Sequence, residues 1–299
     1  MAIEPKPPAD VAIDVPLVRA LLREQHPDLE DLALRGIGEG WDNTLFRLGD
    51  GLAVRIPRRA ASAALIEHEQ RWLPALAPRL PLPVPVPQRI GRPGCGFPWS
   101  WSITAWFDGA SALVAPEQDT ATIAVALGRF LRALHQPAPA DAPRNPWRGV
   151  PLADRTATLL ENLRNVDALV DRGSVLAVWE RALATPRWPG PPLWIHGDLH
   201  PGNLLVHRGC LSAVIDFGDL TAGDPATDLS VAWMQLPPPD RATFRASARG
   251  PFPIDDDTWT RARGWAVALG IAYMARSRDE AAMGALGRAT VEAVLSDIA

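Results

Sequence analysis

The chain has 299 residues, of which 47% are hydrophobic and 21% charged, a composition typical of a globular protein with one large domain or two lobes. Its net charge of −4 and isoelectric point near 5.9 give no general attraction to nucleic acid or to an anionic membrane. Two distant cysteines fit no disulfide or zinc spacing, and no apolar run approaches the roughly 20 residues of a membrane span, so we expect a cytoplasmic protein without nucleic-acid, membrane or protein partners.

The N-terminal third alternates between helical and extended patterns. Apolar residues at helical spacing predict a helix over 14–26, and a second helical stripe covers 62–76. Between them, glycine-rich turns separate three short extended segments, at 32–38, 43–49 and 52–57, as in an antiparallel meander. The proline-rich stretch 78–88 must be an extended connector, and two further strands are predicted at 88–91 and 101–107.

The rest of the chain is predominantly helical in pattern. A hinge is expected over 108–116, followed by a single interruption at 193–218 that predicts a strand, a loop and a hairpin turning at Arg208 and Gly209. The predicted helices lie at 119–135, 153–171, 174–184, 224–235, 240–248, 256–276 and 278–297. The order of elements therefore predicts a small strand-rich lobe that leads into a larger helical lobe.

Two neighbouring motifs hold the residues best suited to chemistry. In "HGDLHPGN" (196–203), Asp198 and Asn203 stand five positions apart, and in "VIDFGD" (214–219) Asp216 follows the predicted hairpin. Phosphoryl transfer needs a carboxylate that orients and deprotonates a hydroxyl, and oxygen ligands that hold Mg²⁺ on the phosphates. The spacing follows the catalytic-loop and metal-loop pattern of protein-kinase-like enzymes.

Together with "GDPATDL" (223–229), these motifs resemble the aminoglycoside phosphotransferase family of kinase-like small-molecule kinases. The resemblance implies an α+β, bilobal protein-kinase-like fold, with a nucleotide-binding lobe over 1–107 and a catalytic and acceptor-binding lobe over 108–299. It implies Mg²⁺ as cofactor and ATP or GTP as phosphoryl donor. The residue roles that it implies are Asp198 as catalytic base, Asn203 and Asp216 as Mg²⁺ ligands, and His196 and Asp228 as structural support of the catalytic loop.

The phosphate-binding strand lacks the expected lysine, since Lys6 is the only lysine of the chain. Arg55 in "LAVRIP" stands where the family has a Lys or Arg that reaches the phosphates, and the strand alternation places it opposite Val54 and Ile56. Its partner on the next helix is Glu67 or Glu69, of which the family pattern favours Glu69. Arginine keeps its charge and binds carboxylate and phosphate in a bidentate manner, so the ion pair survives the replacement.

The remaining nucleotide contacts are expected from the resemblance. Gly40 and Asn43 lie in the glycine-rich hairpin that would cover the phosphates, whose glycines allow close backbone approach. Backbone groups of Ala105 to Phe107 match the linker where the base would rest. His200, by contrast, is interpreted as an ordinary loop or surface residue.

The acceptor is not specified by these motifs. From residue 236 onward, where the family builds its acceptor pocket, eight acidic residues stand against eight arginines, without the acidic excess that a polycationic aminoglycoside would favour. We expect an ATP- or GTP-dependent kinase that phosphorylates a hydroxyl of a small molecule, such as an aminoglycoside- or macrolide-type antibiotic. The alternatives are a metabolic kinase of the choline, homoserine or sugar-amine type, and a non-catalytic kinase-fold module that only binds nucleotide.

Overall fold

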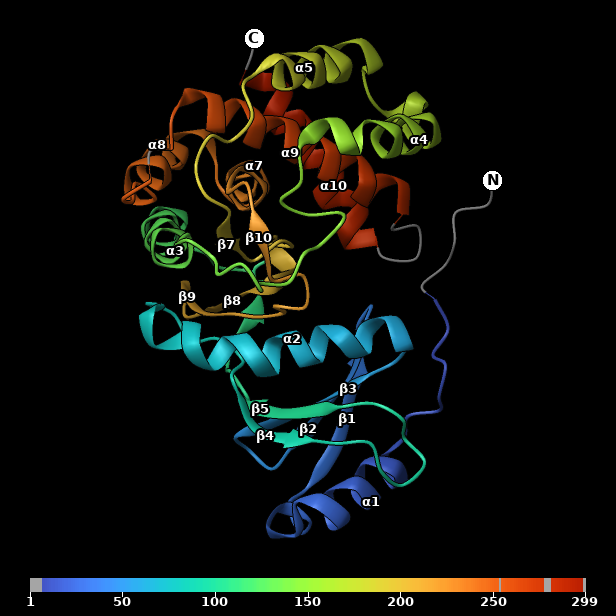
Figure 1. Ribbon diagram of the computed structural model, residues 1–299. Helices are drawn as coiled ribbons and strands as arrows, with labels where there is room; N and C mark the ends of the chain where they lie inside the picture. The colour runs from blue at the N-terminus through green and yellow to red at the C-terminus, as the bar shows by residue number, and fades with distance from the viewer. Residues whose placement is uncertain (1–6, 253, 277–280, 298–299) are drawn as a thin grey trace.

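The computed structural model describes residues 7–252, 254–276 and 281–297. Its N-terminal part is an antiparallel five-stranded sheet, and its C-terminal part is mainly helical (Figure 1). The strand order is β1-β2-β3-β5-β4, which places β3 at the centre of the sheet. The strands are β1 (Leu34–Glu39), β2 (Asn43–Leu48), β3 (Leu52–Pro57), β4 (Pro87–Gly91) and β5 (Trp101–Ala105).

One face of the sheet packs against α1 (Val15–Gln25). Asp14 caps this helix by accepting a hydrogen bond from the Leu17 backbone N–H at 2.8 Å. The helix buries an apolar stripe in a compact core whose sheet residues include Val54, Ile56 and Trp101. Because successive side chains of a strand point to opposite faces, Arg55 faces the other side of the sheet.

The opposite face is covered by α2 (Ala60–Leu76), which lies between the sheet and the helical part (Figure 1). Its buried positions recur every three or four residues and include Ile66, Glu69 and Leu73. Leu73 belongs to the core of the helical part, and the neighbouring Trp72 ring lies 5.1 Å from that of Trp194. The helix therefore packs on both parts of the molecule.

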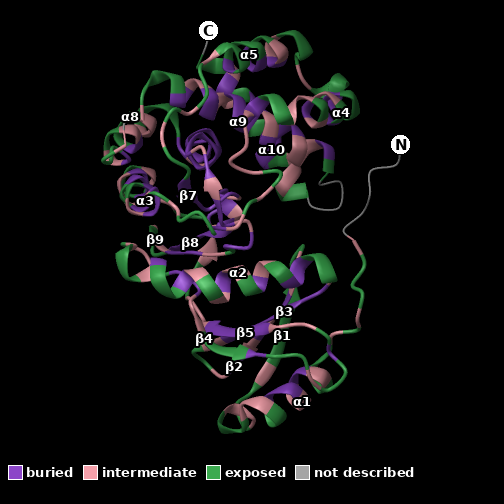
Figure 2. Ribbon diagram, in the orientation of Figure 1, coloured by how far each residue is buried: buried purple, intermediate pink, exposed green. Residues whose placement is uncertain are grey.

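The helical part contains two small sheets: in Figure 1, β7 and β10 lie among its helices, and β8 and β9 lie on the side that faces α2. One pairs β7 (Leu193–Ile195) with β10 (Thr221–Gly223), and the other contains β6 (Ala110–Ser111), β8 (Leu204–His207) and β9 (Cys210–Val214). Figure 2 shows buried residues concentrated where the helices face one another and these strands. The α-helices are α3 (Thr120–Leu134), α4 (Thr156–Val166), α5 (Arg172–Ala184), α6 (Ala226–Leu229), α7 (Val231–Gln235), α8 (Pro238–Ser247), α9 (Asp256–Arg276) and α10 (Ala281–Ser296).

The predicted α+β fold, with a small antiparallel sheet before a mainly helical part, is confirmed. The single helix predicted over 153–171 is wrong: the segment forms the 3₁₀-helix η3 (Leu152–Arg155), then α4, then η4 (Asp167–Leu169). The helical run ends before Asp171, which takes an extended conformation and caps α5 by accepting from the Gly173 N–H.

The predicted hinge over 108–116 contains β6, which pairs with β8. The lobe boundary between residues 107 and 108 falls between β5 and β6 and stays a prediction. Lys6 and residues 278–280, where the last predicted helix begins, lie outside the described residues. Within the described part, no helix has a stretch long and apolar enough to cross a membrane.

Candidate active site

The motif loop over 196–203 leaves β7 and is held at its start by a buried carboxylate. Asp228, on α6, is fully buried, and its two oxygens accept hydrogen bonds from the backbone N–H groups of His196 (2.8 Å) and Gly197 (2.9 Å). Its Oδ2 also lies 3.1 Å from His135 Nε2 at the end of α3. These backbone contacts fix the loop to the helical core.

The His196 ring braces the same loop from within. Its Nδ1 accepts a hydrogen bond from the Asp198 backbone N–H at 3.3 Å, so Nε2 holds the proton and donates to the Ile215 carbonyl at 3.0 Å. The ring also packs against Phe217, with centroids 4.5 Å apart. His196 thus links the loop that bears Asp198 to the loop that bears Asp216.

Gly197 is required by the geometry of this turn. Its φ is +87°, in the left-handed region, and a Cβ at this position would lie 2.4 Å from the Asp219 carbonyl oxygen. The glycine of "HGD" therefore allows the two loops to approach each other.

The Asp198 carboxylate is paired with a guanidinium group. Arg148 Nη2 donates to Asp198 Oδ1 at 2.9 Å, and Arg148 Nε lies 3.5 Å from Asp219 Oδ2. Burial would raise the pKa of Asp198, but the Arg148 charge and the His200 ring outweigh burial and hold it well below its usual range. About one quarter of the side chain is exposed, so an ionised carboxylate faces the exterior at this point.

Asn203 and His200 complete the loop. Asn203 Nδ2 donates to the Asp198 carbonyl at 2.9 Å. The side-chain Oδ1 of Asn203 has no hydrogen-bond partner among the described residues. His200 caps η5 (Pro201–Asn203) by accepting from the Gly202 N–H at 3.0 Å, and its Nε2 lies 3.5 Å from Asp198 Oδ2. His200 lies in a loop, as one of its two interpretations had it, but it is not a surface residue, because its side chain is buried against Asp198 and Tyr273.

Asp216 lies at the start of the second loop, two residues after β9, and adopts a left-handed φ of +62° that is uncommon for a residue with a side chain. Half of its carboxylate side chain is exposed. Among the described residues, no three His, Cys, Asp or Glu side chains form a metal-binding cluster. Mg²⁺, however, prefers hard oxygen ligands and binds with only one or two protein groups besides phosphate and water. The Asp216 carboxylate and the free Asn203 amide oxygen fit that requirement.

Arg55 lies beneath this loop. Its guanidinium forms a buried ion pair with Glu69 on α2, and its Nη2 lies 3.6 Å from Asp216 Oδ1. Burial would lower the pKa of Arg55, but the carboxylates of Glu69 and Asp216 raise it above the usual value. Glu69 is the partner because it belongs to the buried stripe of α2, whereas Glu67 is exposed and bonds the Ser100 hydroxyl at 3.1 Å.

The other residues expected to contact a nucleotide lie at the edges of the sheet. Gly40 and Asn43 close the β1–β2 hairpin through a 2.7 Å hydrogen bond from the Gly40 N–H to the Asn43 carbonyl. The Asn43 side-chain Oδ1 is buried without a partner. Ala105 ends β5 and pairs with Leu52, and Phe107 follows two residues later in the connection to the helical part.

Sequence reasoning missed two residues beside Asp198. Arg148 comes from an irregular segment 50 positions earlier, where no motif or periodicity distinguishes it from the other arginines. Tyr273, on α9, belongs to no motif, but its hydroxyl is buried without a partner among the described residues and its ring lies edge-on to that of His200, with centroids 5.6 Å apart. Burial and the Asp198 charge raise the pKa of Tyr273 well above its usual value, so its hydroxyl keeps its proton.

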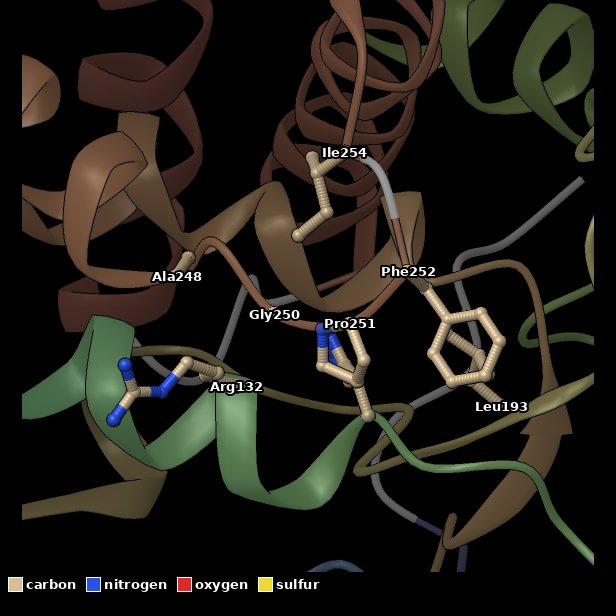
Figure 3. A pocket seen from close by; sticks show the side chains of 8 residues that line it. Arg132, Leu193, Ala248, Gly250, Pro251, Phe252 and Ile254 are labelled. Carbon is tan, nitrogen blue, oxygen red and sulfur yellow. The ribbon is translucent and has the colours of Figure 1, made fainter.

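Two hollows lie near this site. An open one of about 380 Å³ adjoins Pro201 and has only neutral lining side chains, including those of Leu113, Gln118, Met234, Gln235 and Leu286. The second, shown in Figure 3, measures about 10 Å³ and lies next to His135, behind the Asp228 contact. A volume of that size holds about one water molecule, which excludes it as a substrate pocket.

The sequence matches the model of one protein family. Residues 33–265 match APH, the phosphotransferase enzyme family. A comparison with curated protein sequences finds no match.

Solved structures share the fold over nearly the whole chain. The GDP and kanamycin complex of an APH(2″) enzyme has a TM-score of 0.71 and 20% identity, covering 94% of this chain and 98% of that chain. The macrolide 2′-phosphotransferase of Brachybacterium faecium, as apoenzyme, has a TM-score of 0.63 and 22% identity, and the match covers 93% of this chain and 97% of that chain. The streptomycin and ATP complex of another APH(2″) enzyme has a TM-score of 0.60 and 18% identity, and the match covers 92% of this chain and 95% of that chain. At these identities the likeness establishes the kinase-like fold.

The Asp228 contacts predict that Asp228→Asn, although nearly isosteric, strongly lowers the stability of the fold. In Asp228→Asn, one of the oxygens that accept backbone N–H bonds becomes an N–H donor, so a buried donor loses its acceptor. We expect the free energy of unfolding to fall by about 2 to 4 kcal/mol in urea denaturation. The matched control Glu180→Gln, on the exposed surface of α5, should change it by less than about 0.5 kcal/mol. Equal midpoints for the two variants would show that the Asp228 contacts do not hold the loop.

Proposed function

The chain belongs to the phosphotransferase enzyme family, and from that premise we propose that it transfers the terminal phosphoryl group of ATP or GTP to a hydroxyl group of a small molecule. The observation that supports this most directly is the grouping of Asp198, Asn203 and Asp216 around one pair of linked loops. The similar solved structures include complexes with GDP and with ATP, which agrees with a nucleotide donor.

In the proposed site, each residue has one task. Asn203 and Asp216 would hold Mg²⁺ through their side-chain oxygens, and the ion would neutralise charge on the phosphates. Arg55 would bind the phosphates of the donor, oriented by its pair with Glu69. Gly40 and Asn43 would cover the phosphates, while backbone groups at Ala105 and Phe107 would bind the base. His196 and Asp228 would keep the catalytic loop in place.

Asp198 would orient the acceptor hydroxyl and receive its proton. The acceptor oxygen forms a bond to the terminal phosphorus as the bond from phosphorus to the bridging oxygen breaks, and the nucleoside diphosphate leaves with that electron pair. An Asp198 carboxylate with a low pKa is a weak base, so its main contribution is to hold the hydroxyl in line. The hydroxyl proton moves to Asp198 as the acceptor oxygen donates a lone pair to phosphorus and its O–H becomes more acidic.

This assignment predicts that Asp198→Asn lowers kcat by about 10²- to 10⁴-fold, because the amide keeps the shape but neither holds the acceptor hydroxyl as a carboxylate does nor accepts its proton. Nucleotide affinity should stay within about threefold of the wild type, because Asp198 is assigned to the acceptor. Phosphoryl transfer to a panel of hydroxylated compounds and nucleotide binding by calorimetry measure the two effects. Nucleotide binding without any turnover in the wild type would instead favour a non-catalytic binding module.

The low pKa of Asp198 also makes a prediction about pH. A carboxylate with a depressed pKa is ionised from mildly acidic pH upward, so its protonation should not limit wild-type kcat/KM between pH 5 and 8. Without the Arg148 charge, burial should raise the Asp198 pKa, and in Arg148→Gln the acid limb should move up by about one pH unit or more. The control is Arg144→Gln, an exposed arginine of the same segment. Superimposable normalised profiles for all three proteins would contradict this electrostatic role.

A further inference from the structure

Positively charged side chains gather around the segment that pairs with Asp198. Arg148 lies in the loop after α3, Arg155 ends η3 seven residues later, and Arg276 ends α9. Arg148 is occupied by two carboxylates, those of Asp198 and Asp219. Neither of the other two arginines lies within ion-pair distance of any carboxylate in the described chain.

Arg155 is held in place but lacks an acceptor. Its guanidinium carbon lies 5.0 Å from the ring centroid of Trp147, a cation–π contact that fixes the side chain. Its Nη1 is buried without a hydrogen-bond partner. A buried guanidinium N–H without an acceptor is unfavourable, and the Arg155 side chain as a whole is only partly buried. Its guanidinium is therefore suited to bind an oxygen that the described chain does not supply.

The charges around Arg155 are of its own sign. Burial first, and then the neighbouring Arg148 and Arg276, lower the pKa of Arg155 to about 10, and no carboxylate opposes them. It therefore stays charged at neutral pH in a locally repulsive environment. A bound anion would remove that repulsion.

Arg276 is connected to the site through α9. Its Nε donates to the Oδ1 of the buried Asn162 on α4 at 3.3 Å. Tyr273, whose hydroxyl lacks a partner near Asp198, stands three residues earlier and so on the same face of α9. The face that reaches the catalytic loop at Tyr273 therefore continues to Arg276 one turn later.

We propose that the acceptor is a small hydroxyl compound that also bears a carboxylate or phosphate, and that Arg155, supported by Arg276, binds this anionic group while the hydroxyl lies at Asp198. This inference rests on the proposed function, because that function places the acceptor hydroxyl at Asp198. The exposed Trp147 ring, 57% accessible, would contact the carbon skeleton between the two groups. The site thereby differs from one suited to a polycation.

A further observation weighs against a cationic acceptor. The carboxylates of Asp198 and Asp219 are already neutralised in part by Arg148. A compound with several ammonium groups would be repelled by the positive charges of Arg148, Arg155 and Arg276.

A binding experiment tests the anion site apart from catalysis. The protein is saturated with Mg²⁺ and a non-hydrolysable ATP analogue, so that the nucleotide site is filled, and inorganic phosphate is titrated in a calorimeter at constant ionic strength. We expect saturable binding by the wild type, a Kd about tenfold higher in Arg155→Ala, and a smaller increase in Arg155→Lys. Arg164→Ala, which removes an exposed arginine of α4, is the matched control and should bind as the wild type does.

No phosphate binding by the wild type, or equal affinities in the wild type and Arg155→Ala, would overturn the inference. Circular dichroism and urea denaturation of each variant show whether the fold is kept. Arg155→Lys, which restores the charge, makes the result independent of any folding defect in the alanine variant.

An acceptor experiment then separates this inference from the proposed function. Hydroxyl compounds are compared in matched sets whose second group is carboxylate, phosphate, neutral or ammonium. We expect the higher kcat/KM for the carboxylate or phosphate members, and an increase in KM of about tenfold for them alone in Arg155→Ala. Preference for ammonium members, unchanged in Arg155→Ala, would overturn the anion site and leave the phosphotransferase standing. Phosphate binding through Arg155 with no turnover of any acceptor would overturn the proposed phosphotransferase function and leave Arg155 as an anion site.

Discussion

The buried ion pair between Arg55 and Glu69 joins the central strand of the sheet to α2, and the same guanidinium approaches Asp216 in the loop after β9. A guanidinium withdrawn from water is tolerated only when charged partners compensate the lost solvation. The strand, the helix and the loop must therefore keep one arrangement. This requirement brings the proposed phosphate-binding residue and one proposed metal ligand together at the interface of the two parts of the molecule.

A second buried carboxylate imposes a similar constraint on the loop that bears Asp198. Asp228 holds the backbone at His196 and Gly197, and the His196 ring extends the connection to the backbone beside Asp216. At the exposed end of the loop, the positive charge of Arg148 lowers the pKa of Asp198 and keeps its carboxylate ionised. Rigid support from the core and an ionised carboxylate at the surface are together what in-line transfer to a hydroxyl requires.

Sequence reasoning was sufficient wherever the information is local. Strand alternation placed Arg55 opposite Val54, and the motif spacing singled out Asp198, Asn203 and Asp216 as one group. The stripe of α2 could also have distinguished Glu69 from Glu67, because only Glu69 follows the three- and four-residue spacing of the buried positions. What could not be predicted depends on contacts between distant segments without regular structure. Arg148 reaches Asp198 from an irregular loop, and Arg155 has an environment that no periodicity encodes.

The central claim is that Arg55 binds the phosphates of the nucleotide, as the family resemblance implies for a Lys or Arg on this strand. Calorimetric binding of the Mg²⁺ complex of a non-hydrolysable ATP analogue tests it most directly. Arg55→Ala should weaken binding by about 30-fold or more, since it removes one partner of a buried charge contact, whereas Arg55→Lys should stay within about tenfold of the wild type. The double variant Arg55→Ala, Glu69→Gln, which leaves no unpaired buried carboxylate, should regain stability but not affinity. Wild-type affinity in Arg55→Ala would contradict the account.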